Sequence, residues 1–388
     1  MNKTGRDTSL PPHGDKPISD VHDHHLRPKL DQPAEWWYYN GHLASGENRY
    51  SFHVAFFRFS TDDYRIGRFI PLRAFTGAVA VAHASLIDHR AGTTQFGHRR
   101  DMLFSPSKLL VRQKTADFDF RLGQWSIMGN QYEHHIQFQL GDAELDLDLS
   151  PAKPVVSYHA HSFQPPLSRA STHCSSPRLN VSGSIRKGSQ SREVQGISWL
   201  DREHGAIGPD HEVAGWMWLS IQLNNGTEMM FYRVLKRGTD VPSLKFILID
   251  QESQLISIDA DSIETIPLRS WISPRTGVEY DLGWKIQLHD HQITLTLDAI
   301  VDDLEFDTPG STHARYWEGP MKVTGRVEDA AVSGHAYMER LGESVIPGRR
   351  TIDHAKKNLS LAGYLQNELQ FRTQRKDELR LCQVERDR

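Results

Sequence analysis

Apolar and polar residues alternate with a period of two along most of this chain. In RYSFHVAFF the apolar side chains fall at Tyr50, Phe52, Val54 and Phe56. AELDLDLS (143–150) and HQITLTL (291–297) alternate in the same way. This pattern is typical of half-buried antiparallel strands, and helical stripes are almost absent before about residue 352. We therefore predict an all-β fold of many short strands, closed into barrels or sandwiches, with a short C-terminal helical tail.

The sequence also carries an internal repeat. EWWYYNGHLASG aligns with GWMWLSIQLNNG, which places Trp36 against Trp216 at an offset of 180. Further matches follow in the same order at shrinking offsets: Trp125 with Trp284, Gly183 with Gly325, and Gly196 with Gly334. Preserved order indicates a duplicated β-domain whose second copy has lost loop residues. We expect a flexible arm over 1–30, one domain over 31–205, a second over 206–350, and the helical tail over 351–388.

Composition excludes several classes of protein. The net charge of -4 and a pI of about 6.6 leave no basic excess for nucleic acid. The two cysteines are far apart and have no metal-binding spacing. The polar N-terminus lacks the apolar stretch of a signal peptide, and no apolar run is long enough to span a membrane. We expect a cytoplasmic protein with no metal and no cofactor, since nucleotide, hydrolase and zinc motifs are absent.

GISWLDREHG (196–205) concentrates ionisable residues in one predicted strand. Strand geometry places Trp199, Asp201 and Glu203 on one face, with Arg202 and His204 on the other. An acid facing inward beside tryptophan is partly desolvated, which raises its pKa and suits a proton donor. The alternative is structural: Asp201 pairs with Arg202 at the surface or accepts amide hydrogen bonds at a turn.

The second copy repeats this segment as GHAYMERLG, in which Tyr337 and Glu339 take the places of the tryptophan and the aspartate. Aromatic clusters accompany both copies. In WWYY (36–39) one pair of rings should point inward and the other toward a second layer or a neighbouring domain. Core packing explains any single aromatic residue, whereas together they are typical of a pocket for a hydrophobic ligand.

Several motifs occur in an order that resembles one family. PAEWWYYNGHL, AHASLID, SSPRLNVSG, GISWLDREHG, GWMWLSIQLNNGTEMMFYR, YWEGPMKVTG and GHAYMERLG are similar to the AttH/carotenoid 1,2-hydratase family, also called hydroxyneurosporene-synthase-like proteins. The resemblance covers about residues 33–345. It implies two tandem lipocalin-like domains with a pocket between them for a long, apolar, unsaturated ligand. The family includes hydratases that add water to acyclic carotenoids and pericyclases that fold polyenes by a Diels–Alder reaction.

One departure bears on activity. In the hydratases, the segment that corresponds to residues 199–205 resembles the pattern Tyr-His-Asp-His-Asn-Trp-Gly. In this chain the segment begins with Trp199, Leu200 and Asp201 and ends with Gly205. The aspartate and glycine are retained, while the tyrosine and the first histidine are replaced. This form looks more like the AttH-type members that have no assigned activity.

Our leading hypothesis is a cofactor-independent hydratase acting on a polyene or isoprenoid. Asp201 protonates the alkene, the faces of Trp199, Trp36 and Trp37 stabilise the cation, and Glu203 or His204 positions or deprotonates the water. A pericyclase and a non-catalytic lipocalin-like carrier are the alternatives. The expected substrate-binding residues are Trp36, Trp37, Tyr38, Tyr39, His83, Trp216, Trp218, Trp317, Glu318, Tyr337 and Glu339. The expected partner is a hydrophobic small molecule, with peripheral membrane contact and oligomeric state left open.

Overall fold

The computed structural model describes residues 26–61, 65–66, 70–71, 77–103, 117–158, 171–205, 213–239, 241–308 and 315–341. Over these residues the regular structure is strand, apart from two short 3-10 turns, η3 (Ala260–Ser262) and η4 (His289–His291). The predicted all-β class is confirmed. Residues 1–25 of the expected arm and the whole of the expected helical tail lie outside the described residues.

The first large sheet is antiparallel and has 11 strands in the order β6-β5-β2-β1-β13-β12-β10-β9-β8-β7, with β11 paired to β12. Its strands are β1 (Ala34–Ser45), β2 (Asn48–Ser60), β5 (Ala78–Asp88), β6 (Thr93–Leu103), β7 (Phe118–Leu122), β8 (Trp125–Gly129), β9 (His134–Leu140), β10 (Ala143–Pro151), β11 (Val156–Ser157), β12 (Ser171–Lys187) and β13 (Gln190–Gly205). A separate ribbon pairs β3 (Arg65–Ile66) with β4 (Ile70–Pro71).

The second large sheet has 10 strands in the order β17-β16-β15-β14-β23-β22-β20-β19-β18, with β21 paired to β22. Its strands are β14 (Val213–Leu223), β15 (Glu228–Lys236), β16 (Ser243–Ile249), β17 (Leu255–Ile258), β18 (Ile263–Ile272), β19 (Glu279–Leu288), β20 (Ile293–Ala299), β21 (Glu305–Asp307), β22 (Arg315–Val327) and β23 (Ala330–Leu341).

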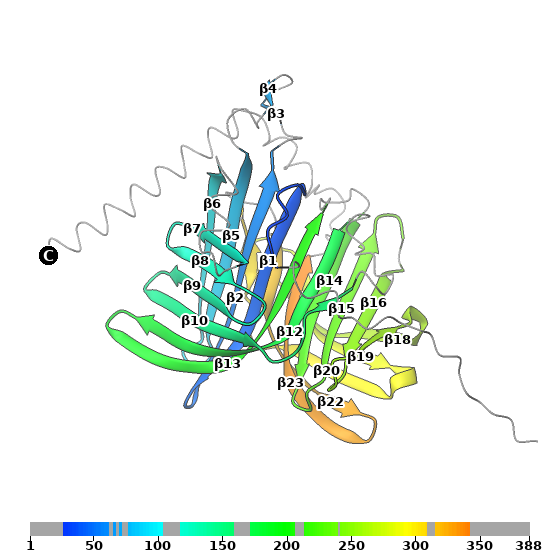
Figure 1. The fold of residues 1–388 in the computed structure, drawn as a ribbon. Coiled ribbons are helices and arrows are strands. Elements are labelled where there is room, and N and C mark those ends of the chain that lie inside the picture. Colours follow the sequence, from blue (N-terminus) through cyan, green and yellow to red (C-terminus); the bar gives the residue numbers. More distant parts are fainter. Residues whose placement is uncertain are drawn as a thin grey trace, which may run out of the picture.

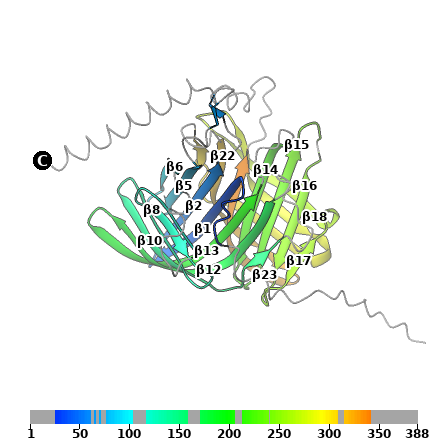
Figure 2. The ribbon, with the colours of Figure 1, turned by 45° about the horizontal axis from the view of Figure 1, so that its top comes forward.

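Each sheet curls around its own core, and the two lie side by side (Figures 1 and 2). In the first sheet, Gln95 of β6 donates a hydrogen bond of 2.8 Å to Asp142, which lies between β9 and β10. This contact joins strands that stand far apart in the sheet order, so the sheet bends back on itself. The predicted alternation supplies the core, because the apolar members of β10 are buried while the acidic members face outward.

Three apolar clusters follow from this arrangement. One fills the first curled sheet and a second fills the other. The third lies between the sheets and combines Tyr38, Tyr158 and Trp199 with Trp218 and Tyr232. Most of β1 and β2 and the second half of β13 are therefore buried on both faces, one against their own core and one against the second sheet.

The predicted repeat appears in the strand register. Asp201 of β13 is opposite Tyr38 of β1, and Glu339 of β23 is opposite Trp218 of β14. A close approach of neighbouring strands recurs as well. A Cβ on Gly196 would lie 1.9 Å from the His42 carbonyl oxygen, and one on Gly334 would lie 2.3 Å from that of Gln222. Both positions accept only glycine, for the same steric reason.

Residues 26–33 are tied to one end of the first sheet. The Leu26 carbonyl accepts a 3.0 Å hydrogen bond from the Trp37 indole, and Leu26 itself is buried. Arg202 lies over the Trp37 ring at 3.9 Å, donates to the Arg27 carbonyl at 3.0 Å, and forms an ion pair with Glu35. Residues 26–30 of the expected arm are thus held in place.

Arg202 also removes one structural alternative raised by the sequence. Its buried partner is Glu35, which Arg58 contacts as well, and not Asp201. The corresponding Arg340 lies 3.5 Å from Asp281. The repeated acid–arginine sequence therefore does not form an acid–arginine pair within either strand, because the two side chains point to opposite faces.

Candidate functional site

Ionisable side chains from both sheets meet within the third cluster. On the first sheet Ser175, Asp201 and Tyr38 lie abreast on β12, β13 and β1. On the second sheet Trp218, Glu339 and Glu318 lie abreast on β14, β23 and β22. The Tyr38 hydroxyl donates a 2.5 Å hydrogen bond to Glu318 and so joins the two rows. The group comprises Tyr38, Tyr158, His173, Ser175, Trp199, Asp201, Glu203, Trp216, Trp218, Tyr232, Glu318 and Glu339, and we call it the inter-sheet site.

Asp201 is the acceptor at the centre of the first-sheet half. The Trp199 indole donates to Oδ1 at 2.6 Å, and the Ser175 hydroxyl donates to the same oxygen. The Nε2 atom of His173 lies 3.0 Å from Oδ2. The Tyr158 hydroxyl donates to Ser175 at 2.8 Å, so a relay of hydroxyls ends on the carboxylate. A buried carboxylate needs such partners, since an unpaired charge there is very costly.

The surroundings of His173 act on its pKa in opposite directions. Burial by itself lowers its pKa, but the Asp201 carboxylate and the charge of Glu203 outweigh burial and raise the pKa of His173 overall. The ring meets Tyr158 edge-on at a centroid distance of 4.9 Å and Tyr232 at 6.1 Å. This side of the site therefore places the buried His173–Asp201 contact inside an aromatic wall.

The second-sheet half holds carboxyl groups in a different state. Burial, helped by the charges of Asp201 and Glu203, raises the pKa of Glu339 to about 7, although the 2.8 Å hydrogen bond from Trp216 opposes the shift. Burial and the charge of Glu339 raise the pKa of Glu318 well above its usual value, against the hydrogen bond from Tyr38. Both side chains therefore keep their protons to a higher pH than carboxylic acids in water do.

Neutral histidines and tyrosines extend the site along β2 and β5. Burial, followed by the charge of His98, lowers the pKa of His83 to about 3, so the ring is neutral. Its Nδ1 atom lies 2.7 Å from the Tyr316 hydroxyl of the second sheet. His53 contacts Ser85 at 2.9 Å, and the Tyr337 hydroxyl is 3.5 Å from the same serine. This strip supplies hydrogen bonds without added charge.

Aromatic rings complete the walls. Tyr38 meets Trp218 edge to face at 5.4 Å, and Trp199 meets Trp218 at 6.4 Å. Trp36, which lies on the same face of β1 as Tyr38, packs against Phe57 of β2 at a centroid distance of 6.1 Å. Such rings offer apolar surface and π faces that attract a cation.

The structure brings together most of the residues that the sequence selected. Trp36, Tyr38, Trp199, Asp201 and Glu203 face the second sheet, as does His83 on β5. Tyr337 of β23 faces the first sheet from the opposite side, where it meets His53. Trp216, Trp218, Glu318 and Glu339 face them from the other side. The expectation that the two pairs of WWYY point in opposite directions agrees with this arrangement.

Four selected residues lie elsewhere. Trp37 and Tyr39 belong to the core of the first sheet, and Trp317 belongs to the core of the second. His204 is opposite Glu35 in the register, so it shares the Arg202 face of β13 and points away from Asp201. Alternation along a strand separates these residues from the inter-sheet site. The same reasoning corrects the inward-facing Asp201: the acid faces the other sheet and not the interior of its own barrel.

Sequence reasoning missed His173, Ser175, Tyr158 and Tyr232. A signal existed for two of them, because His173 and Ser175 alternate along the strand that pairs with GISWLDREHG. Tyr158 had none, since it lies just beyond the two-residue strand β11 and is placed by tertiary packing. Among the described residues no group of three or more metal-binding side chains is arranged to hold a metal ion. No described helix is long and apolar enough to cross a membrane.

The chain matches one family model, and its fold is similar to several solved structures. The family model described as AttH-like matches residues 12–343. A crystal structure of a putative AttH from Nitrosomonas europaea superposes with a TM-score of 0.70 at 24% identity, covering 86% of this chain and 98% of its own. Kievitone hydratase from Nectria haematococca gives 0.63 at 13% identity, covering 82% and 91%. CghA gives 0.53 at 12%, covering 87% and 95%. Among curated protein sequences none matches.

Proposed function

This chain belongs to the AttH-like family, and on that premise we propose that it is a hydratase, which adds water to a carbon–carbon double bond of an apolar small molecule. The observation that carries the proposal is that two acids with raised pKa values face a buried aspartate–histidine contact at one interface. Glu318 and Glu339 lie on one side, and Asp201 with His173 lies on the other.

An interface that served only for packing would not need these groups. Burying carboxylates costs free energy, and apolar residues of similar volume generally stabilise such a contact as well or better. Strongly shifted pKa values that cluster with aromatic rings are typical of sites that move protons. A structural neighbour named as a hydratase supports the same class of reaction.

The proposed reaction begins with proton transfer. Glu339, protonated below a pH of about 7, gives its proton to one alkene carbon, and a C–H bond forms as the π bond breaks. The adjacent carbon becomes a cation, which the faces of Trp36, Trp199 and Trp218 stabilise. Water then attacks this carbon and forms the C–O bond.

Asp201 completes the reaction as the acceptor. Its carboxylate takes the proton released when an O–H bond of the attacking water breaks, and the product is an alcohol. His173 keeps the carboxylate oriented and compensates its charge. Asp201 then releases its proton to solvent and Glu339 takes one up from solvent, which restores the starting state. This assignment moves the donor role from Asp201, which accepts hydrogen bonds from Trp199 and Ser175, to the acid in the equivalent position of the second copy.

The substrate that we propose first is an acyclic isoprenoid polyene, in keeping with the family resemblance. The test is to incubate the purified protein with such polyenes in ¹⁸O-labelled water and to weigh the products by mass spectrometry. Gain of one labelled water by the product is the expected result. A product of unchanged mass and new retention time would indicate cyclisation, and saturable tryptophan quenching without product would indicate a carrier.

Two variants separate the chemistry from the scaffold. Glu339→Gln keeps the size of the side chain and removes the transferable proton, so product formation should be lost. Glu305→Gln is the matched control, because Glu305 is also a buried acid of the second sheet but bonds to Ser273 and Tyr280 outside the site. Equal loss in both variants would contradict the assignment of Glu339.

A further inference from the structure

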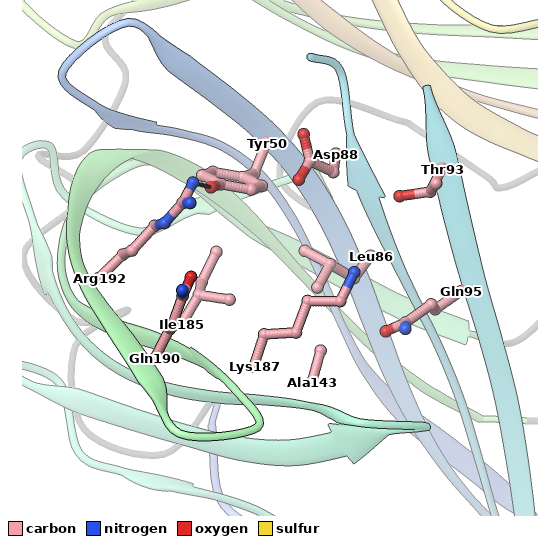
Figure 3. Close-up of a pocket in the computed structure, with 10 residues that line it drawn as sticks. All are labelled: Tyr50, Leu86, Asp88, Thr93, Gln95, Ala143, Ile185, Lys187, Gln190 and Arg192. Carbon is pink, nitrogen blue, oxygen red and sulfur yellow. Dashed lines mark hydrogen bonds between the residues drawn. The ribbon is translucent and has the colours of Figure 1, made fainter. Parts of the chain in front are cut away.

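A separate cavity of about 210 Å³ opens at the opposite end of the first sheet (Figure 3). Its lining comes from the start of β2, β6, β10 and β13 and from the end of β5 and β12. Asp201 and Glu203 of the inter-sheet site fall near the other end of β13, and Glu318 and Glu339 lie on the second sheet. No step of the proposed hydration uses this cavity.

The floor of the cavity is part of the first hydrophobic core. Leu86, Ala143 and Ile185 line it, and all three are buried members of that core. Tyr50 adds a ring from the start of β2. An apolar chain that entered here would therefore contact core side chains, and both the chain and these side chains would be removed from water.

The rim is cationic. Lys187 and Arg192 project from the hairpin of β12 and β13, and Figure 3 shows Arg192 directed toward Tyr50 and Lys187 extending toward Leu86. Arg192 donates a 3.1 Å hydrogen bond to the Tyr50 hydroxyl, and among the described residues neither cation is ion-paired with a carboxylate. Their neighbour Arg186, by contrast, is paired with Glu144.

One carboxylate also lies at the rim, and its hydrogen bonds are local. Asp88 Oδ1 accepts from the amides of Arg90 and Ala91 at 3.1 and 3.0 Å, which fixes it as the cap of its own turn. The rim thus has two cations, Lys187 and Arg192, and one acid, Asp88, which already accepts two backbone hydrogen bonds. The balance of charge at the rim favours an anion over a cation or a neutral group.

We propose that this cavity binds a short-chain carboxylate, with its apolar chain on the Leu86–Ile185 floor and its carboxylate between Lys187 and Arg192. The volume of the cavity limits the length of the ligand, because 210 Å³ is about seven water volumes at about 30 Å³ each. A chain of roughly six carbons fits this space. Charged hydrogen bonds to an arginine and a lysine hold the head group.

The test uses the full chain with hexanoate and hexanamide, which share the apolar chain and differ in charge. Methyl-selective NMR follows the signals of Leu86 and Ile185 during titration. Hexanoate should shift these methyl signals in a saturable way and bind about tenfold more tightly than hexanamide. No shift at these methyls, or equal affinity for the two compounds, would overturn the proposal.

Matched variants locate the site. The double change Lys187→Gln with Arg192→Gln should weaken hexanoate binding about tenfold and leave hexanamide unchanged, whereas Ala143→Leu should weaken both by filling the floor. Arg186→Gln is the control, since that arginine is on the same strand and is paired with Glu144. Hexanoate binding by the double variant with wild-type affinity would contradict the site. The Glu339→Gln variant should bind hexanoate normally, so this result is independent of the proposed hydration.

Discussion

Carboxyl groups of the same kind are given different states by their neighbours in the inter-sheet site. Asp201 receives hydrogen bonds from Trp199 and Ser175 and lies beside His173. Glu318 and Glu339 have fewer donors and feel the charge of other acids, so burial keeps their pKa values high. Acids in such different surroundings commonly divide the donor and acceptor roles of a reaction.

The first prediction concerns the pH dependence of turnover. Glu339 must be protonated to act as donor, and its pKa is raised to about 7. The rate is therefore full below this pH and falls as the pH rises through about 7. Glu339→Gln should lower kcat by about 10²- to 10⁴-fold. Steady-state kinetics from pH 5 to 9 measure both effects, and a wild-type rate that stays constant across this range would contradict the role of Glu339.

The second prediction concerns the ion pair. The Asp201 carboxylate is the main group that raises the pKa of His173 against the effect of burial. In Asp201→Asn that support is lost while burial remains, so the pKa of His173 should fall below its ordinary value. Histidine ring signals followed by NMR during a pH titration report this directly. A His173 pKa equal in both proteins would show that the two residues are not coupled.

Sequence analysis selected the acids of this site and gave them roles that differ from those we now propose. Spacing alone placed Trp199, Asp201 and Glu203 on one face, and the repeat pointed to Glu339. The sequence led us to assign the donor role to Asp201, whereas our proposal gives it to Glu339, because the choice depends on which hydrogen-bond donors the neighbouring strands supply. His173 and Ser175 come from β12, and only the register of that strand brings them to Asp201.

At the scale of the element, strand β1 shows what a period of two can and cannot predict. Alternation correctly separated Trp36 and Tyr38 from Trp37 and Tyr39. Both faces of β1 are buried, so composition did not reveal which face meets the second sheet. The arginine lying over Trp37 and the acid bonded to Tyr38 distinguish the two faces only in the folded chain.

The third prediction uses this division between faces. Trp37→Phe replaces the indole beneath Arg202 with a smaller ring and removes the hydrogen bond to Leu26, so it should lower the free energy of unfolding by about 1–3 kcal/mol with little change in KM. Trp218→Phe, on the inter-sheet face of β14, should raise KM or lower kcat more than Trp37→Phe does. Urea unfolding and steady-state kinetics of both variants provide the comparison. The reverse pattern would place the substrate inside the first curled sheet.

At the scale of the whole molecule, the site depends on how the two sheets are docked. Glu228 at the start of β15 is fully buried, and Arg178 and Lys153 of the first sheet both pair with it. Arg178 also donates to the Leu223 carbonyl at 2.9 Å, and Lys153 donates to that of Gly226 at 2.6 Å. This ion cluster joins the two sheets at the start of β15.

The fourth prediction follows from that cluster. Glu228→Gln leaves two cations without their buried counter-charge and should cost about 3–5 kcal/mol of unfolding free energy. Product formation should fall as well, since donor and acceptor sit on different sheets. The control is Arg269→Gln, which breaks the more exposed contacts of Arg269 with Asp298 and Asp302 and should cost about 1 kcal/mol or less. Equal destabilisation by the two changes would argue against a docking role for Glu228.

The sequence predicted two related β-units, because strand periodicity and a repeat are local patterns. It did not predict how the units face each other. Lys153 and Arg178 are separated from Glu228 by 75 and 50 residues, and no local pattern links them. The composite character of the site is therefore a property of the docked pair.

The central claim is that Glu339 delivers the proton in an alkene hydration between the two sheets. The most direct measurement is the reaction of an isoprenoid polyene in water labelled with both deuterium and ¹⁸O, followed by mass spectrometry of the product. The account predicts one ¹⁸O in a new hydroxyl group and one deuterium on the neighbouring carbon, with both labels lost in Glu339→Gln and kept in Glu305→Gln. Unchanged incorporation of both labels by Glu339→Gln would contradict it.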